Sequence, residues 1–193
     1  MENNRKIIVA LSGASGSIYA RYLLDELAAL KERPAEVAVV FTDKAGEIWV
    51  YETGKKFNIE DYDQDVFRLY SNNDFYAPFA SGSSRFDTMI ICPASMGMLG
   101  RIAHGVSDDL VSRAADVMLK ERRKLVLVPR ETPYNLVHIN NMKLLTQAGA
   151  IILPATPSFY TKPSTIEELV MTVVERILDI TGFDPEAKRW GEG

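Results

Sequence analysis

Short apolar runs rich in Val, Ile and Leu recur along the chain, separated by longer stretches that mix polar and apolar positions. Five runs stand out, at residues 6–11, 36–41, 87–92, 125–128 and 150–153. Because these runs show little polar alternation, they are typical of strands buried on both faces of a parallel sheet. Strands that alternate with helical segments predict an α/β fold, namely a three-layer Rossmann-like or flavodoxin-like domain with a mostly parallel sheet.

Helical segments between these strands are marked by apolar spacing and by capping residues. A stripe of apolar residues from 20 to 27 follows the i, i+3, i+4, i+7 spacing of a helix. We expect Ser107 to be the N-cap of a later helix, and Thr132 with Pro133 to begin another. Residues 55–87 form the least regular section, with charged and aromatic positions by turns.

Length and composition favour a single domain that spans residues 1–193. Of these 193 residues 47% are hydrophobic, which is enough to bury a core. No apolar run approaches the roughly 20 residues of a membrane span, and the start of the chain shows no signal peptide. We therefore expect a cytoplasmic protein. Cys92 is the only cysteine and lies in an apolar run, which favours a buried hydrophobic role over a nucleophilic one.

Charge is distributed unevenly along the chain. The net charge of −4 gives no argument for binding nucleic acid. Between residues 113 and 131, however, six Lys and Arg residues accompany three acidic ones, a balance that suits a small anionic ligand. Arg113 and Lys120 lie two turns apart on one side of a predicted helix. The alternative is that both form surface ion pairs with Asp116, which is three or four positions away.

Polar and glycine residues follow the predicted strands, at the edge where open α/β sheets bind ligands. Residues 12–16 (SGASG) form either an anion-binding corner or a tight turn that needs glycine. Residues 80–84 (ASGSS) form either a flexible linker or a second loop that presents hydroxyl and amide groups to an anion. Arg130 and Glu131 follow Pro129, which ends the fourth strand, and they form either a mutual ion pair or part of a reaction site.

Four segments carry a resemblance to a known family. They are GASG at 13–16, CPASMG at 92–97, RAADVMLKERRKLVLVPRETP at 113–133 and ILPATPSFY at 152–160. Together they resemble the UbiX-type flavin prenyltransferases, which belong with the wider homo-oligomeric flavin-containing decarboxylases of the same α/β fold. The resemblance extends over nearly the whole chain, down to EAKRW at 186–190, and the long central segment is its most specific part.

The resemblance implies a metal-independent prenyltransferase. Such an enzyme transfers a dimethylallyl group from dimethylallyl monophosphate to reduced FMN, with new bonds at flavin N5 and C6, and the prenylated FMN serves a UbiD-type decarboxylase. The resemblance also implies a homo-oligomer, a dodecamer in known relatives, with sites built where subunits meet. Two alternatives stay open: an FMN-dependent decarboxylase, and a non-catalytic flavin-carrying small subunit of an aromatic-acid decarboxylase.

The resemblance implies roles for individual residues as well. The expected catalytic residues are Ser15, Glu52 and Glu131. The residues expected to bind FMN are Gly13, Ala14, Ser15, Thr42, Ser95, Met96, Gly97, Met98 and Arg130. The residues expected to bind dimethylallyl phosphate are Ser81, Arg113, Lys120, Arg130, Tyr160 and Arg176. Trp190 is expected to act as a lid, in a tail of residues 183–193 that packs on the site or on a neighbouring subunit.

The chemistry of these residue types fits the implied reaction. Cations neutralise the charge that develops on a leaving phosphate, so no metal is expected. Glu131 is the preferred base for the proton lost at ring closure, with the departed phosphate as its competitor. His104 and His138 are the only histidines, and we expect structural roles for both. The decarboxylase alternative is disfavoured because such enzymes typically present a histidine before the PAS-type loop, whereas the first hundred residues contain none.

Overall fold

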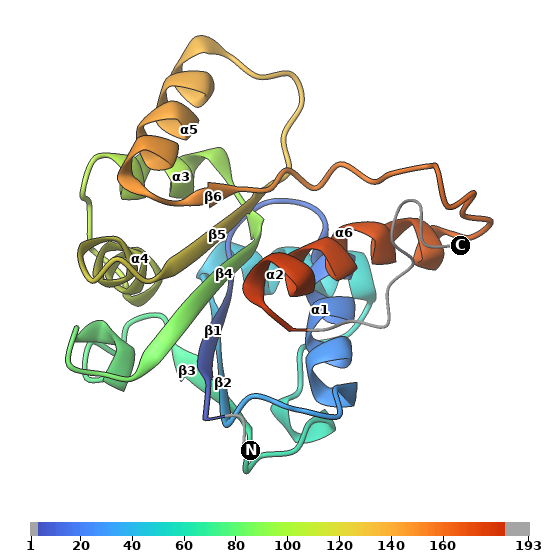
Figure 1. Cartoon of the computed structure of the whole chain (residues 1–193), viewed down its shortest axis with the longest axis horizontal. Helices are drawn as coiled ribbons and strands as arrows, with labels where there is room; N and C mark the ends of the chain where they lie inside the picture. The colour runs from blue at the N-terminus through green and yellow to red at the C-terminus, as the bar shows by residue number, and fades with distance from the viewer. Residues whose placement is uncertain (1–3, 184–193) are drawn as a thin grey trace.

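The computed structural model describes residues 4–183 and contains a six-stranded sheet in which every pairing is parallel (Figure 1). The strands lie in the order β3-β2-β1-β4-β5-β6. Their bounds are Lys6–Leu11 for β1, Glu36–Phe41 for β2, Phe67–Ser71 for β3, Phe86–Ala94 for β4, Lys124–Pro129 for β5 and Ile151–Ile152 for β6.

Six α-helices and two short 3-10 helices connect the strands in the described part of the chain. The α-helices are α1 (Ser17–Ala29), α2 (Asp43–Thr53), α3 (Met96–Ala103), α4 (Leu110–Lys120), α5 (Leu136–Ala148) and α6 (Ile166–Thr181). The 3-10 helices η1 (Ile59–Asp61) and η2 (Pro78–Ala80) lie in the connections before and after β3.

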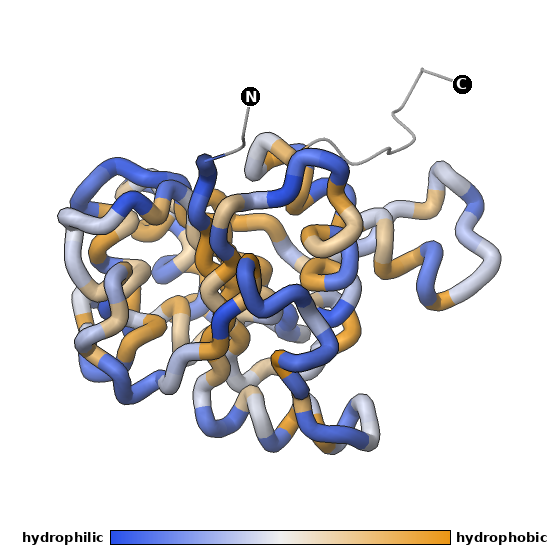
Figure 2. Tube along the Cα trace, turned by 90° about the horizontal axis from the view of Figure 1, so that it is seen from below, coloured by the Kyte–Doolittle hydropathy of each residue, from blue (hydrophilic) through white to orange (hydrophobic). Residues whose placement is uncertain are grey.

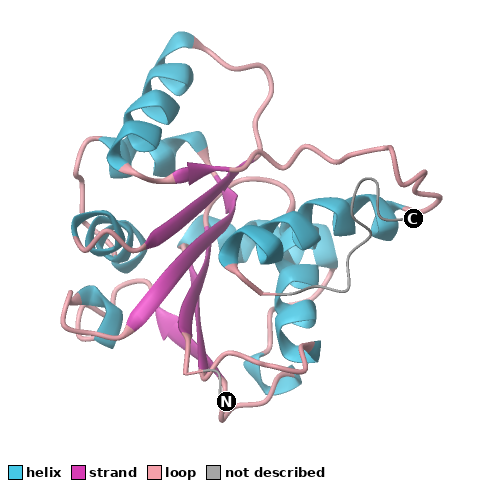
Figure 3. Ribbon diagram, in the orientation of Figure 1, coloured by secondary structure: helices cyan, strands magenta, loops and turns pink. Residues whose placement is uncertain are grey.

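Helices cover both faces of the sheet and so make three layers (Figure 3). Side chains alternate between the two faces along β1. Ile8 and Ala10 belong to a buried cluster with residues of α3, α4 and α5, whereas Ile7, Val9 and Leu11 belong to a cluster with residues of α1, α2 and α6. Apolar positions are concentrated in the interior of the molecule (Figure 2), where the side chains of the central strands are buried. The predicted three-layer, Rossmann-like or flavodoxin-like α/β fold with a parallel sheet is confirmed.

The strand β3 lies within residues 55–87 and was not predicted from the sequence. It pairs with β2, with Phe67 opposite Val37 and Ser71 opposite Phe41. Because β3 lies at the end of the sheet, only one of its sides is paired, and Phe67 is the only one of its five residues that is buried. An edge strand of this kind needs no continuous apolar run, so the pattern that marks the central strands is missing here.

The helix starts also differ from the predictions at two places. Helix α4 begins after Asp109 rather than after Ser107, because the Asp109 carboxylate accepts the backbone N–H of Ser112 at 2.8 Å. Helix α5 begins at Leu136 rather than at Pro133, because the preceding Asn135 side chain caps it. In both cases a capping side chain closer to the helix satisfies the free N–H groups of the first turn.

The two ends of the described chain lie together. The Arg5 guanidinium lies 4.4 Å from the centroid of the Phe183 ring, and its Nη2 donates to the Thr181 carbonyl at 2.8 Å. Trp190 and the rest of the predicted tail lie outside the described residues, so their roles stay predictions. Among residues 4–183, no helix combines the length and the apolar character that a membrane span requires.

Candidate active site

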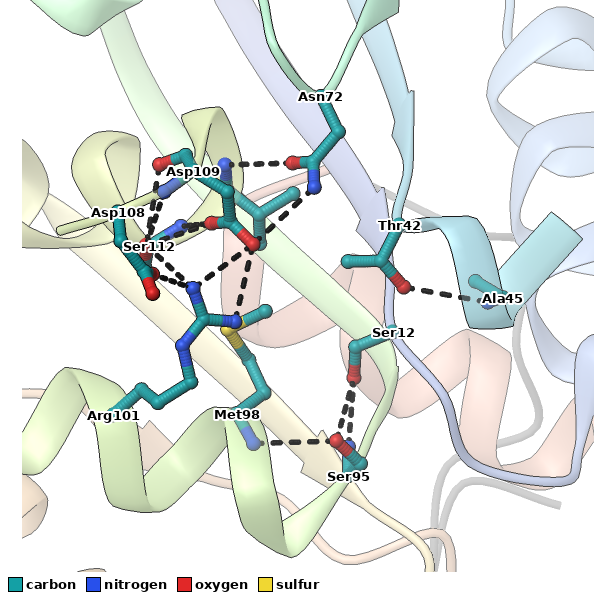
Figure 4. Close-up of polar contacts among 11 residues, drawn as sticks. Ser12, Thr42, Ala45, Asn72, Ser95, Met98, Arg101, Asp108, Asp109 and Ser112 are labelled. Atoms are coloured by element: carbon teal, nitrogen blue, oxygen red, sulfur yellow. Dashed lines mark hydrogen bonds and ion pairs between the residues drawn. The ribbon is translucent and has the colours of Figure 1, made fainter. Parts of the chain in front are cut away.

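Polar side chains stand at the carboxyl ends of four neighbouring strands (Figure 4). Ser12 follows β1, Thr42 follows β2, Asn72 follows β3 and Ser95 comes directly after β4. Ser12 joins two of these loops, since its Oγ accepts the N–H of Ser95 at 2.7 Å and lies 3.4 Å from the Ser95 Oγ. This edge of the sheet therefore carries a row of hydroxyl and amide groups.

Helices α2 and α3 begin at the same edge, each capped by one of these hydroxyl groups. Thr42 Oγ1 accepts the N–H of Ala45 at 3.3 Å, and Ser95 Oγ accepts the N–H of Met98 at 3.2 Å. The remaining N–H groups of a first turn have no partner within the helix, and they give the N-terminus a positive potential. Residues 96–98, predicted to bind flavin, form the first turn of α3. Both helix ends therefore suit an anionic or strongly polar ligand.

The turn between β1 and α1 leaves little room for side chains at its glycines. A Cβ on Gly13 would lie 3.0 Å from the Cβ of Lys44. Gly16 has a φ of 117°, and a Cβ there would lie 3.1 Å from the ring of Tyr19. The N–H of Ala14 donates to the Ser12 carbonyl at 2.7 Å, which tightens the turn further. These glycines are needed for the backbone conformation and for the approach of neighbouring side chains.

The anion at the start of α1 is a side chain of the protein itself. The Glu52 carboxylate, near the end of α2, accepts the N–H of Gly16 at 3.1 Å and the N–H of Ser17 at 2.7 Å. Partial burial raises the pKa of the Glu52 carboxyl, but hydrogen bonds from Ser15, Ser17 and Gly16 outweigh that effect, so the pKa lies below its ordinary value. The corner predicted to bind an anion is therefore occupied by Glu52, and Glu52 lies beside Ser15.

Arg130 and Glu131 have separate partners within the described chain, so of the two alternatives the mutual ion pair is not found there. Arg130 Nε donates to the Ser15 carbonyl at 2.9 Å. Glu131 Oε1 accepts the backbone N–H of Thr132 at 3.0 Å. Arg130 thus joins the end of β5 to the turn after β1. Of the predicted site residues, the structure brings Ser15, Glu52 and Arg130 into direct contact.

A second group of predicted residues lies around η2 and the face of α4. Arg113 Nε donates to the Ala80 carbonyl at 3.0 Å. A Cβ on Gly82 would lie 2.7 Å from Lys120 Nζ, so the loop of residues 80–84, called the serine loop below, passes directly over this lysine. Ser81, Arg113 and Lys120 are therefore gathered by one loop. Residues 75–78, 80, 81, 83 and 84 line an adjacent cavity of about 450 Å³.

Within this second group, Lys120 and Gly82 lie far from the edge of the sheet that carries Ser12 and Ser95. Arg123 Nη2 donates to the Gly82 carbonyl at 2.6 Å, and its Nη1 donates to the carbonyl of Phe86 at 3.1 Å. Phe86 is the first residue of β4, which has nine residues and ends beside Ser95. At about 3.3 Å per residue, the two ends of β4 are roughly 25 Å apart.

Arg176 lies on the other face of the sheet from Arg113 and Lys120. It belongs to α6, which packs with α1 and α2, whereas α4 packs on the opposite face. Tyr160 lies in the long arm between β6 and α6, which extends away from the sheet in Figure 1, and it is 52% exposed. One copy of the chain therefore does not bring all the predicted phosphate-binding residues to one place.

Sequence analysis did not find a polar cluster that positions the start of α4 (Figure 4). Asn72 Nδ2 and Arg101 Nη1 donate to Asp109 Oδ2 at 3.2 and 3.1 Å, and Asn72 Oδ1 accepts the N–H of Val111 at 3.2 Å. Partial burial raises the pKa of the Asp109 carboxyl, but hydrogen bonds from Ser112, Asn72 and Arg101 outweigh it and lower the pKa. Because β3 was missed, the residue at its carboxyl end was missed with it.

The remaining candidates for chemistry are Cys92 and the two histidines. Cys92 is fully buried, burial raises the pKa of its thiol, and the predicted hydrophobic role is confirmed. His104 Nδ1 lies 2.8 Å from the Gly100 carbonyl, and His138 packs against the N-cap of α5. Within residues 4–183, no group of three or more His, Cys, Asp or Glu side chains is arranged to hold a metal ion.

A family profile and sequence relatives match nearly the whole chain. The sequence profile of the Flavoprotein family matches residues 1–178. A flavin prenyltransferase UbiX from Methanocaldococcus jannaschii is 43% identical over 194 residues, which cover 96% of this chain and 98% of that protein. The chain belongs to the UbiX flavin prenyltransferase family. The predicted resemblance is thereby confirmed.

Two solved UbiX-type structures match over nearly the whole chain. The crystal structure of AnUbiX in complex with FMN and dimethylallyl pyrophosphate is 40% identical, covers 98% of this chain and 99% of its own, and superimposes with a TM-score of 0.88. A dodecameric FMN-dependent UbiX-like decarboxylase from Escherichia coli is 39% identical, covers 96% of this chain and 98% of its own, and has a TM-score of 0.86.

Proposed function

We propose that this protein is a flavin prenyltransferase, which joins the dimethylallyl group of dimethylallyl monophosphate to N5 and C6 of reduced FMN. Membership of the UbiX family supports this activity. The structural observation that carries it is the hydrogen bond from Arg130 Nε to the Ser15 carbonyl. That bond sets a cation beside the glycine turn and Glu52, at the edge where α/β sheets bind ligands.

The residues at this edge fit FMN. Two helix N-termini and the hydroxyl groups of Thr42 and Ser95 suit the phosphate and ribityl groups, and Gly13 lets the backbone approach a ligand closely. Reduced FMN, when bound, supplies the electron-rich N5 and C6 atoms that form the two new bonds. The proposed FMN-binding residues are Gly13, Ala14, Ser15, Thr42, Ser95, Met96, Gly97, Met98 and Arg130.

The donor phosphate is bound by cations and hydroxyl groups. When the allylic C–O bond breaks, both its electrons leave with the phosphate, so cations positioned there stabilise the developing charge. Arginine grips phosphate through two parallel bonds, whereas lysine acts as a point charge. The proposed donor-binding residues are Ser81, Arg113, Lys120, Arg130, Tyr160 and Arg176. Trp190, outside the described residues, is the proposed lid.

A complete donor site requires a second copy of the chain. Lys120 and Arg176 lie on opposite faces of one sheet, and Lys120 lies near the amino end of β4. The chain also exposes apolar side chains that an assembly would cover, including Leu136 and Val137 on α5, Phe159 on the arm and Tyr76 beside the serine loop. The E. coli relative is dodecameric. We propose a homo-oligomer, a dodecamer by analogy, in which neighbouring subunits complete each site.

Proton transfer falls to the acidic residues of the site. Ring closure releases a proton, and Glu131 is the proposed base, held in place by the N–H of Thr132. The Glu52 carboxyl has a lowered pKa and accepts hydrogen bonds from Ser15, Gly16 and Ser17, so its proposed role is to hold Ser15 and the turn in position. The released phosphate is the alternative acceptor of the proton.

A second function, FMN-dependent decarboxylation, is suggested by the description of the E. coli relative. Such decarboxylases typically present a histidine before the loop that corresponds to residues 93–95, whereas His104 and His138 both follow that loop in this chain. A non-catalytic flavin carrier has no use for Arg113 and Lys120 beside the serine loop. The transferase is therefore favoured, with a UbiD-type decarboxylase as the proposed recipient of the prenylated FMN.

An anaerobic mass measurement tests this function. The purified protein is incubated with reduced FMN and dimethylallyl monophosphate, and the flavin is expected to gain the mass of one prenyl group. Oxidised FMN and omission of the donor serve as controls. Unchanged flavin mass in a sample that binds FMN would contradict the transferase. Carbon dioxide release from an aromatic acid without a flavin mass change would support the decarboxylase.

A further inference from the structure

The three cationic side chains on helices that are proposed to bind the donor phosphate each form an ion pair with a nearby carboxylate. The carboxylate lies on the same helix or, for Lys120, at the C-cap position of that helix. The three ion pairs are Arg113–Asp116, Lys120–Glu121 and Arg176–Asp179. All six side chains are partly exposed, between 35% and 61%. A phosphate that binds these cations therefore meets a carboxylate beside each of them.

The pairs on α4 lie directly under the serine loop. Arg113 Nη1 lies 3.1 Å from Asp116 Oδ2, while its Nε holds the Ala80 carbonyl. Gly82 passes over the Lys120–Glu121 pair so closely that a Cβ on Gly82 would overlap the Glu121 carboxylate. Arg123 anchors the same loop through the Gly82 carbonyl. The carboxylates are thus at the same place as the cations and not elsewhere on the helix.

The carboxylate of Glu121 is the most strongly held of the three by neighbouring cations. A hydrogen bond from Lys120, the attraction of Lys120 and the charge of Arg123 lower the pKa of the Glu121 carboxyl. Around the serine loop, three cations (Arg113, Lys120 and Arg123) therefore face two carboxylates, Asp116 and Glu121. The local excess of positive charge is small. An added negative charge on a ligand is therefore attracted less strongly than the number of cations alone suggests.

We propose that Asp116, Glu121 and Asp179 are specificity-determining residues that make the site favour dimethylallyl monophosphate over the diphosphate. This inference rests on the proposed function, because it concerns the donor of that reaction. A phosphate monoester carries a charge of about −1.5 to −2 at pH 7, and the diphosphate carries more. The phosphate group of the donor has to displace each carboxylate from its cation, and the displaced carboxylate then lies beside the bound phosphate. The repulsion grows with the charge of the donor and is larger for the diphosphate.

The test compares donors in variants that remove these charges. Asp116→Asn, Glu121→Gln, Asp179→Asn and the triple variant are assayed anaerobically with reduced FMN for kcat/KM with each donor. Each single change is expected to lower the monophosphate preference about 2- to 5-fold, the range of a partly exposed ion pair. The triple variant is expected to lower it by about 10-fold or more, and high salt is expected to shrink the effect. A preference unchanged in the triple variant overturns the inference.

Two control variants separate charge from structure. Asp116→Glu keeps the carboxylate and is expected to keep the wild-type preference. Asp63→Asn removes a carboxylate that pairs with Arg33 at 3.0 Å, outside the proposed site, and is expected to change nothing. A shifted preference in either control would assign the effect to folding or to net charge instead.

A binding measurement distinguishes failure of this inference from failure of the proposed function. Calorimetric titration of the FMN-loaded protein with inorganic phosphate and with pyrophosphate needs no turnover. If the wild type makes no prenylated flavin, the proposed function fails. A pyrophosphate affinity that rises more than the phosphate affinity in the triple variant would still support the role of the three carboxylates in disfavouring the diphosphate. A different outcome is that prenylated flavin forms in the wild type while the triple variant leaves both the donor preference and the ratio of pyrophosphate to phosphate affinity unchanged. In that case only the proposed role of the three carboxylates in donor specificity fails.

Discussion

The carboxylate of Glu52 accepts the backbone N–H of Ser17 at 2.7 Å, and so one helix caps the start of another. The N-cap position of α1 is Gly16, which has no side chain to do this. Glu52 comes from the last turns of α2 and also accepts the N–H of Gly16. The turn that carries Ser15 is therefore held by a residue 36 positions away in the sequence. Its geometry depends on the packing of α2 beside α1.

Removing this cap is expected to destabilise the protein. Glu52→Ala leaves the first N–H groups of α1 without their acceptor, and the free energy of unfolding is expected to fall by about 1–2 kcal/mol. Urea unfolding followed by circular dichroism measures the change. Glu47→Ala is the matched control, because Glu47 lies on the same helix in an exposed pair with Lys44 and is expected to cost less than about 0.5 kcal/mol. Equal losses in both variants would contradict the capping role.

Acid is expected to destabilise the protein through Glu52 and Asp109. Both carboxyls have pKa values below their ordinary values of 4.5 and 3.8, so the folded state binds fewer protons than the unfolded state at low pH. Their contribution is complete above about pH 5 and is lost as the pH falls through the ordinary and then the lowered pKa values. Unfolding free energies at pH 7, 5, 4 and 3 measure this loss. In Asp109→Asn the unfolding free energy is expected to fall less steeply with decreasing pH. A pH dependence identical to that of the wild type would contradict the role of Asp109.

The predictions from sequence succeeded where one local pattern decides the structure. The run at residues 125–128 lies in the buried part of β5, and the apolar stripe from 20 to 27 forms the buried side of α1. β3 was missed because an edge strand with one buried residue, Phe67, has no such pattern. The helix start at Asp109 was missed because Ser107 is an equally good cap by residue type, and only packing against Asn72 and Arg101 decides between them.

The candidate site shows the same division. The glycine turn at residues 13–16 was found, since glycine and serine after a strand are a local signal. That Glu52 fills the turn, and that Arg130 bonds Ser15 instead of Glu131, depends on contacts between distant segments. The placement of Arg113 and Arg176 on opposite faces of the sheet is a property of topology, and no residue spacing within either helix reveals it.

A substitution at Gly82 is expected to alter the donor site with little effect on folding. A Cβ at this position meets Lys120 and Glu121 at the far ends of their flexible side chains, which move at small cost. Gly82→Ala is therefore expected to keep the unfolding free energy within about 0.5 kcal/mol. The KM for the donor is expected to rise about 3- to 10-fold, the effect of weakening one charged contact. Steady-state kinetics and urea unfolding measure the two quantities.

Gly46 provides the control for this substitution. It lies inside α2, and a Cβ there meets no atom within 4 Å. Gly46→Ala is expected to stabilise the protein by about 0.4–1 kcal/mol and to leave the donor KM unchanged. An unchanged donor KM in Gly82→Ala would show that the serine loop does not position Lys120 for the donor.

Replacing the proposed base separates binding from turnover. Glu131 Oε1 accepts the N–H of Thr132, and the amide oxygen of a glutamine keeps that hydrogen bond, so Glu131→Gln is expected to fold and to bind FMN normally. It is expected to lose about 100-fold or more in turnover, since a positioned base contributes this much. Anaerobic single-turnover mass spectrometry measures the rate, and a flavin titration measures binding. Wild-type turnover in this variant would leave the released phosphate as the acceptor of the proton.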